Sequence, residues 1–120
     1  MNFKSNKPIY LQIVDFCFQN ILTGEWAKDN RIPSVRELGL TLQVNPNTVM
    51  RAFEYMQTED IIYLKRGMGY YVSPEARKKI LTLQKKEFFE EILPATFESM
   101  DLLNISIEEI VKHYEQYKEK

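Results

Sequence analysis

The sequence has 120 residues, which is enough for one domain or for one small domain with an appendage. Apolar residues make up 44% and charged residues 28%, a balance typical of a folded globular protein. The net charge of −1 excludes a strongly basic coat for non-specific nucleic-acid binding, although a local basic patch is compatible with it. No stretch approaches the ~20 apolar residues of a membrane helix, and the first residues lack a signal-peptide core. We therefore expect a cytoplasmic protein with no membrane partner.

The sequence offers little for catalysis or metal binding. Its single cysteine, Cys17, excludes an internal disulfide, and one cysteine with one histidine, His113, makes a transition-metal site or a Cys/His pair hard to build. Adjacent carboxylates such as Glu90 and Glu91 do not share a helix face, so solvation explains them better than acid/base chemistry. We expect no catalytic residue, no metal and no cofactor, and we predict that the protein is not an enzyme.

Three helices are predicted in the first half of the chain. The first begins at Pro8, where a missing N–H costs nothing, and Gly24 ends it as a left-handed cap. Ser34 forms a capping box with Glu37 and opens a short helix over residues 35–42. After a three-residue turn, a longer helix begins with the N-cap and proline pair Asn45-Pro46, and its apolar face consists of Val49, Ala52, Phe53 and Met56. The last two helices form a helix-turn-helix pattern.

A β-hairpin is predicted next. Residues 61–66 and 70–72 are β-branched and aromatic runs, and Gly67-Met68-Gly69 separates them. A hairpin that follows a helix-turn-helix is a wing. We therefore predict a mainly α fold with a small β wing, in which residues 1–73 form a winged helix-turn-helix DNA-binding domain.

The remaining residues, 74–120, are predicted to form a C-terminal helical dimerisation segment. They contain no glycine, and they hold more apolar residues than a free helix should expose, so these residues either pack on the winged domain or form a homodimer interface. Pro94 should kink or break the long helix near Leu93, and a second capping box, Ser106 with Glu109, should open a final helix. The expected centre of the dimer interface comprises Phe88, Phe89, Leu93, Phe97 and Leu103.

Four segments carry a resemblance to a known family: Pro8–Ile13, Ile32–Leu38, Val44–Phe53 and Gly67–Val72. Their sequences and joint spacing resemble the GntR family of bacterial transcription regulators over about residues 8–73. The short tail resembles the YtrA-like subfamily, whose members carry two C-terminal helices where other subfamilies have a ligand-binding domain. The family usually has glycine at four positions where this chain has Asp29, Gln43, Asp60 and Asn104. The resemblance therefore implies left-handed backbone at these four residues. Asp and Asn tolerate that conformation better than glutamine does, so Gln43 fits it least well.

The helix-turn-helix pattern and the resemblance together predict double-stranded operator DNA as the partner. The candidate DNA-binding residues are Ser34, Arg36, Asn45, Asn47, Thr48, Arg51, Arg66, Gly67 and Gly69. Asparagine can read adenine, threonine can contact a thymine methyl group or a phosphate, and arginine can read guanine or hold a phosphate. Many family members have arginine where this chain has Pro46 and Met50, and Arg51 is the candidate to replace one such contact. The usual mode of the family implies a repressor that binds an inverted repeat as a homodimer.

Alternatives to these assignments stay open at this point. A polar helix face is more often only solvated, and the wing glycines have a full structural explanation in a tight turn. The near-neutral charge and a pI of about 5.9 also leave room for a winged-helix module that binds proteins and not DNA. The sequence names no operator, no regulated gene and no small-molecule effector.

Overall fold

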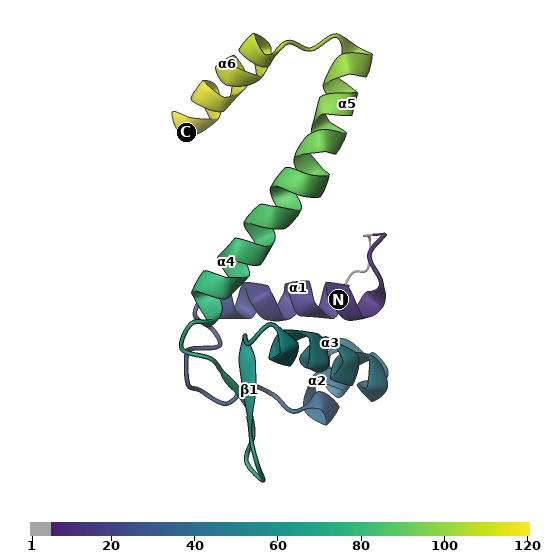
Figure 1. The fold of residues 1–120 in the computed structure, drawn as a ribbon, viewed down its shortest axis with the longest axis vertical. Helices are drawn as coiled ribbons and strands as arrows, with labels where there is room; N and C mark the ends of the chain where they lie inside the picture. Colours follow the sequence, from purple (N-terminus) through teal and green to yellow (C-terminus); the bar gives the residue numbers. More distant parts are fainter. Residues whose placement is uncertain (1–5) are drawn as a thin grey trace. The chain divides into compact units, whose positions relative to one another are not determined.

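A computed structural model describes residues 6–120 and confirms a mostly helical fold with a small two-stranded sheet (Figure 1). The chain divides into two compact units, of which the first ends at Thr82 and the second comprises Leu83–Lys120. The elements in chain order are α1 (Ile9–Leu22), α2 (Val35–Leu42), α3 (Pro46–Thr58), β1 (Ile62–Lys65), β2 (Gly69–Val72), α4 (Ala76–Glu87), the π-helical turn η1 (Phe88–Ile92), α5 (Leu93–Leu103) and α6 (Ile107–Lys118).

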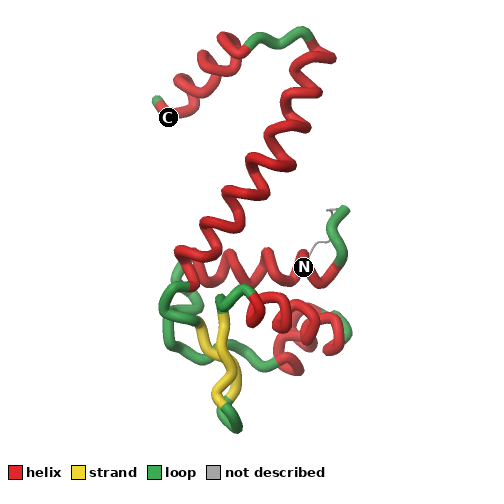
Figure 2. The backbone as a smooth tube through the Cα atoms, viewed as in Figure 1, coloured by secondary structure: helices red, strands yellow, loops and turns green. Residues whose placement is uncertain are grey.

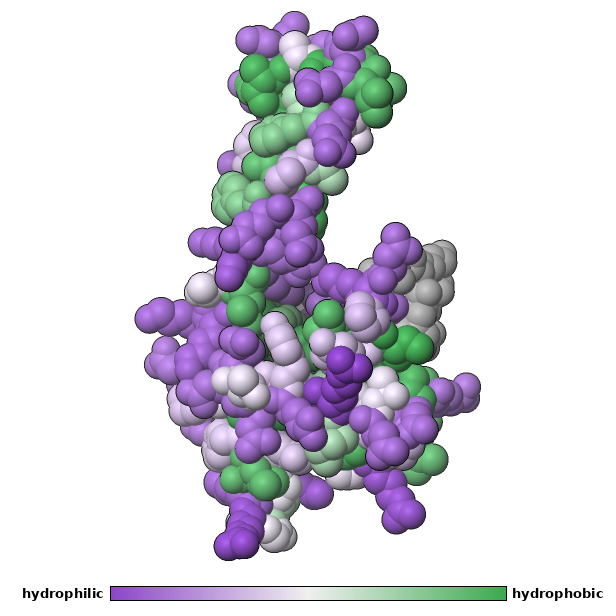
Figure 3. Space-filling model, turned by 45° about the vertical axis from the view of Figure 1, so that its right-hand side comes forward, coloured by the Kyte–Doolittle hydropathy of each residue, from purple (hydrophilic) through white to green (hydrophobic). Residues whose placement is uncertain are grey.

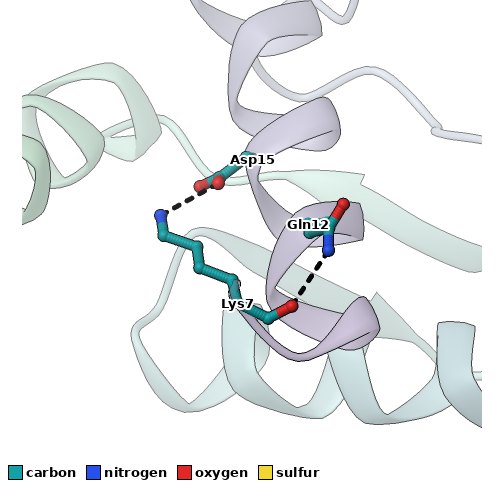
Figure 4. Close-up of polar contacts among 3 residues, drawn as sticks. All are labelled: Lys7, Gln12 and Asp15. Carbon is teal, nitrogen blue, oxygen red and sulfur yellow. Dashed lines mark hydrogen bonds and ion pairs between the residues drawn. The ribbon is translucent and has the colours of Figure 1, made fainter. Parts of the chain in front are cut away.

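Helix α1 begins at Ile9, one residue later than predicted, because Pro8 has non-helical backbone angles (φ −51°, ψ 148°) and takes the N-cap position. Proline has no side-chain group that could cap the helix, and the preceding residue is held instead by two contacts (Figure 4). The side-chain amide of Gln12 donates to the carbonyl oxygen of Lys7 at 2.9 Å, and the Lys7 ammonium lies 3.0 Å from a carboxylate oxygen of Asp15. Just past the end of the helix, Gly24 has a φ of +84°, the left-handed conformation expected there.

The helix-turn-helix is also confirmed, and its two helices begin at the predicted residues. The backbone N–H of Glu37 donates to the Ser34 hydroxyl and the N–H of Ser34 donates to the Glu37 carboxylate, both at 3.1 Å, which completes the capping box of α2. Helix α3 starts at Pro46, where the side-chain oxygen of Asn45 accepts the N–H of Asn47 at 2.8 Å. In each helix, a side chain thus accepts one of the first-turn N–H groups that the helix itself leaves without a partner. These caps fix where the two helices of the helix-turn-helix begin.

All four non-glycine positions at which the resemblance implied left-handed backbone adopt it. Their φ values are +61° for Asp29, +57° for Gln43, +62° for Asp60 and +54° for Asn104. Gln43 caps the C-terminus of α2 and Asn104 caps that of α5. The left-handed region is costly for most residues and milder for Asp and Asn, so Gln43 is the strained member of the set.

The wing is a hairpin in which Ile62 pairs with Val72 and Lys65 with Gly69 (Figure 2). Its turn is closed by a hydrogen bond from the N–H of Met68 to the carbonyl oxygen of Lys65 at 2.9 Å. Gly67 has a φ of +74°, which suits the third position of a type II turn. The predicted hairpin is therefore confirmed.

The core of the first unit lies beneath α3, which packs against α1, α2 and β1. One face of the wing contributes to it, because Ile62 and Val72 are buried and the ring of Tyr70 meets Phe53 edge-on at 5.0 Å. Cys17 is fully buried, and its burial raises the pKa of the thiol, so it packs as a small hydrophobic residue. The buried apolar residues of this core are Ile13, Val14, Cys17, Phe18, Ile21, Ile32, Leu38, Leu42, Val49, Ala52, Phe53, Met56, Ile61, Ile62, Val72, Ala76 and Ile80.

The first compact unit continues beyond Ser73, where the sequence suggested the end of the winged domain. The first turns of α4 bury Ala76 and Ile80 completely, so they complete the core. The side chain of Arg77 also donates to the carbonyl oxygen of Leu22 at 2.7 Å, near the C-terminal end of α1. These contacts explain why the compact unit ends at Thr82 and not at Ser73.

The second unit contains the irregular helix that Pro94 predicts. The irregularity takes the form of the π-helical turn η1, in which the N–H of Leu93 bonds to the carbonyl oxygen of Phe88. Proline lacks an N–H and crowds the carbonyl four residues earlier, and a wider turn relieves that conflict. The helix is not broken, because Ile92 and Leu93 keep right-handed helical angles.

The final helix, α6, begins at the predicted second capping box. The N–H of Glu109 donates to the Ser106 hydroxyl at 3.2 Å, and the N–H of Ser106 donates to the Glu109 carboxylate at 3.1 Å. Of the helices in residues 6–120, none combines the length and apolar character that a bilayer span requires.

Candidate nucleic-acid interface

The starts of α2 and α3 carry five of the predicted DNA-binding residues. Ser34 and Asn45 each use a side-chain oxygen to cap their helices, so the hydroxyl proton of Ser34 and the side-chain NH2 of Asn45 are the groups that can donate to a partner. Arg36 and Asn47 lie in the first turns of α2 and α3 with exposed side chains, and Thr48 is half-buried beside Asn47. The caps therefore fix the helix starts, while the arginine and the asparagine present donors to solvent.

Arg51, one turn further along α3, is not simply solvated. Its guanidinium carbon lies 4.0 Å from the centre of the Tyr10 ring on α1, a cation–π contact. Stacking on a ring occupies the face of the guanidinium and leaves its N–H groups, which lie in the plane, available to an acceptor. The predicted reader is thus exposed but held in place by a residue that the sequence reasoning did not select.

The hairpin turn places Arg66 and Gly67 at the tip of the wing, where both are exposed. Gly67 and Gly69 each have a backbone reason to be glycine, because their φ values are +74° and +116°. The wing tip therefore offers Arg66 as an exposed cation on a tightly constrained turn, and Lys65 precedes it at the end of β1.

The outer face of the wing holds an aromatic and cationic cluster. The Tyr63 and Tyr71 rings stack with their centres 5.8 Å apart, and the Lys65 ammonium lies 4.3 Å from the centre of the Tyr71 ring. The Tyr63 hydroxyl donates to the carboxylate of Asp29 at 3.0 Å. Desolvation, followed by this hydrogen bond, raises the pKa of Tyr63, so the phenol stays protonated at neutral pH.

Arg31 connects the wing with the start of α2. Its backbone bridges to Tyr71 on β2, and the next N–H, that of Ile32, donates to the carbonyl oxygen of Tyr70 at 2.9 Å. Its guanidinium reaches to 4.0 Å from the carboxylate of Glu37 in the capping box of α2. Hydrogen bonds from Ser34, with a smaller contribution from the Arg31 charge, hold the pKa of Glu37 below its usual range.

Sequence reasoning missed both Tyr10 and Arg31. Tyr10 belongs to a segment that resembles the family, but its contact with Arg51 joins two helices far apart in the chain. Arg31 stands one residue before a matched segment, where no spacing rule selects it. Together with Arg31, the exposed cations of α2, α3 and the wing form a set of five: Arg31, Arg36, Arg51, Lys65 and Arg66. They supply the local basic surface that a near-neutral chain needs for a polyanion.

The predicted dimer residues all belong to the second unit. Phe88 and Phe89 lie in η1 with their ring centres 5.3 Å apart, and Leu93 and Phe97 follow on α5 with Leu103 at its end. Within Leu83–Lys120, which the structure describes throughout, no residue of η1, α5 or α6 is buried. Figure 3 shows hydrophobic side chains on the visible surface of this unit. An exposed apolar surface of this kind is typical of a site that binds another protein.

Comparisons with known proteins agree with this geometry. Residues 9–72 match the family of bacterial regulatory proteins named gntR. The uncharacterised helix-turn-helix transcriptional regulator YhcF of Bacillus subtilis is 32% identical over 117 residues, which cover 98% of this chain and 95% of that protein. The transcriptional repressor YtrA of the same bacterium is 33% identical over 103 residues, with 82% of this chain and 79% of YtrA covered.

The same assignment follows from a solved structure. A crystal structure of a regulator assigned to the GntR family, from Bacteroides thetaiotaomicron, superposes with a TM-score of 0.80 at 42% identity and covers 93% of this chain and 97% of that one. The family match spans α1, the helix-turn-helix and the wing, which hold the predicted DNA-binding residues. The relatives are transcription regulators and not enzymes. The chain therefore belongs to the GntR family of bacterial regulatory proteins and is a DNA-binding helix-turn-helix transcription regulator.

Proposed function

We propose that this regulator is a cytoplasmic repressor that binds an inverted-repeat operator as a homodimer and occludes promoter DNA. The observation that carries the proposal is the difference in surface chemistry between the two units. The first unit presents exposed polar and cationic side chains on a helix-turn-helix and a wing, and the second presents apolar side chains that the chain itself leaves unburied. The relative YtrA is a transcriptional repressor by name, which supports the repressor mode.

On this proposal α3 is the recognition helix. Asn47 and Arg51 hydrogen-bond base edges in the major groove, and Thr48 contacts a thymine methyl group or a phosphate. Arg36 on α2 and Arg66 at the wing tip hold phosphates on either side of the recognition helix. The side-chain oxygens of Ser34 and Asn45 fix the helix starts, while the Ser34 hydroxyl and the Asn45 side-chain NH2 donate to phosphates.

The homodimer follows from exposure and symmetry. Phe89 and Leu103 are 62% and 68% exposed within one chain, although their burial would be favourable. A two-fold interface is self-complementary, so one apolar surface serves both subunits. An inverted-repeat operator in turn needs two recognition helices spaced about one helical turn of DNA, ~34 Å, or a multiple of it. The second unit is the part of the chain free to set that spacing.

Selection from a pool of random-sequence duplex DNA tests the proposal. The wild-type protein should enrich an inverted repeat, bind it with an affinity that falls steeply as salt rises, and protect both half-sites in a footprint. Lys78→Gln, which removes an exposed charge from α4, is the matched control and should bind like the wild type. Failure to enrich any sequence, together with binding that salt does not affect, would contradict the proposal and favour a winged module that binds proteins only.

A further inference from the structure

The outer face of the wing hairpin carries cations in addition to Arg66 at its tip. Tyr63 and Lys65 on β1 lie opposite Tyr71 and Gly69 on β2, and directly paired residues point to the same face of a sheet. Arg31 bridges to Tyr71 along the other edge of β2, so its side chain also points to this face. The face therefore carries two cations, one from each edge, that the contacts proposed above do not use.

Gly69 leaves the space in which the Arg31 side chain lies. A β-carbon at residue 69 would come within 2.9 Å of the Arg31 Nε, and within 3.7 Å of its Cδ and Cζ. A side chain at this position would require the flexible end of Arg31 to shift from this path. The bare glycine backbone instead lets Arg31 run across β2 toward the start of α2, where it reaches Glu37.

The guanidinium of Arg31 is only weakly held at its end. The 4.0 Å that separate it from the Glu37 carboxylate exceed hydrogen-bond distance, and the same carboxylate oxygen already accepts the N–H of Ser34. The Arg31 side chain is 55% exposed. An exposed ion pair at this distance contributes little to stability. The N–H groups of Arg31 therefore remain accessible to an anion that binds them more strongly.

Lys65 is placed at the same face by aromatic contacts. Its ammonium lies over the Tyr71 ring at 4.3 Å, and that ring is stacked on Tyr63, whose hydroxyl is anchored to Asp29. A cation over a ring keeps its charge and its donors on the solvent side. The two cations therefore project from a rigid platform and not from a mobile loop.

We propose that Arg31 and Lys65 form a phosphate-binding face, through which the flat outer side of the wing contacts the DNA backbone beside the phosphate that Arg66 holds at its tip. This inference rests on the proposed function and adds residues to it. The planar guanidinium matches two phosphate oxygens at once, while the ammonium acts as a point charge. Arg31 also connects the wing with α2, so one phosphate contact sets the position of both on the duplex.

The test measures the salt dependence of binding by full-length variants. The probes are the duplex that the wild-type protein enriches from random-sequence DNA and an unrelated duplex of equal length. Arg31→Gln removes the charge and keeps a shorter polar side chain, Arg31→Lys keeps the charge, and Lys78→Gln is the control on α4. Thermal unfolding of each variant shows whether a change in binding comes from a loss of structure.

The expected result is specific. Arg31→Gln removes one phosphate contact from each subunit of the proposed dimer, so it should lower the slope of log affinity against log salt by about 1.8 and weaken binding roughly 60-fold at ~0.1 M salt, equally on both duplexes, because a phosphate contact reads no sequence. Arg31→Lys should keep most of the salt dependence of the wild type. Lys65→Gln should lower the slope by about as much as Arg31→Gln does.

Two outcomes overturn the inference in distinguishable ways. If the wild type and Lys78→Gln bind DNA and Arg31→Gln binds with the same slope, the wing face is not a phosphate site and the proposed function stands. If the wild type binds neither duplex, the proposed function fails as well, and the cationic face has an acidic protein or no partner at all.

Discussion

The guanidinium of Arg51 on α3 lies 4.0 Å from the centre of the Tyr10 ring on α1, so the proposed recognition helix presents an arginine that a neighbouring helix holds in place. An unrestrained arginine loses side-chain entropy when it binds DNA, and a pre-positioned one loses less. The contact therefore links the packing of α1 and α3 to the chemistry of the DNA-binding surface.

Replacement of Tyr10 should weaken DNA binding although Tyr10 itself need not contact DNA. Tyr10→Leu keeps apolar volume and removes the ring, and a cation–π contact at an exposed site is worth about 0.5–1 kcal/mol, so affinity should fall roughly two- to fivefold. Tyr10→Phe keeps the ring and should bind like the wild type. Fluorescence anisotropy with the enriched duplex measures this effect, and equal losses in both variants would show that the ring face is not what matters.

Asn47 should carry sequence preference and contribute little to stability. Asn47→Ala removes an exposed amide from the first turn of α3, so it should cost about 1–3 kcal/mol on the preferred duplex and relax the preference at one base position. Gln57→Ala, an exposed amide near the other end of the same helix, is the control. Affinities for a panel of single-base operator variants test the assignment, which is wrong if Asn47→Ala weakens all of them equally.

The elements of this fold were predictable because their signals are local. Capping boxes at Ser34 and Ser106 place helix starts to the residue, and Gly67 marks the wing turn because its φ demands glycine. Contacts across the fold carry no such local signal. The ring beneath Arg51 and the path of Arg31 over Gly69 depend on which elements pack together, so the sequence predicts candidate DNA-binding residues but not the contacts that hold them in place.

Gln43 should be a site of removable strain. It adopts a φ of +57° at the end of α2, where a left-handed conformation costs an ordinary residue about 1–2 kcal/mol and glycine little. Gln43→Gly gains freedom in the unfolded chain as well, so the net stabilisation should be ~1 kcal/mol, or roughly 4–8 °C in melting temperature. Gln43→Ala keeps the strain and serves as the control. Scanning calorimetry decides, and a glycine variant no more stable than the alanine variant would exclude backbone strain at this site.

Acid should weaken the first unit partly through Glu37. Its pKa is lowered in the folded chain by the two hydrogen bonds with Ser34, so the carboxylate stabilises the fold at pH values above its unfolded pKa of about 4.3. This stabilisation is lost as pH falls from that value through the lower folded pKa. Glu37→Gln can still close a capping box but does not titrate. Denaturant unfolding should therefore show the stability gap between wild type and variant changing below about pH 4.3 and staying constant above it; a gap that pH leaves untouched contradicts the assignment.

Charges in the aromatic pair of η1 should dissociate the dimer. Phe88 and Phe89 are both exposed within one chain, so Phe88→Asp with Phe89→Asp should leave the first unit folded while it places two charges in an apolar interface. Sedimentation should then report a monomer, whereas Lys78→Asp, which adds a negative charge on α4, should remain a dimer. Circular dichroism checks that both variants stay helical. A stable dimer of the double variant would show that the interface does not include Phe88 and Phe89.

The central claim is that two copies of the chain read one inverted repeat, and a titration of duplexes with one or two half-sites tests it most directly. The account predicts that wild-type protein binds the two-site duplex as a dimer, at two chains per duplex and with much higher affinity than the one-site duplex. The Phe88→Asp, Phe89→Asp variant should bind both duplexes with the same weak affinity for each half-site. Equal affinity of the wild type for the two duplexes, at one chain per half-site, would contradict the account.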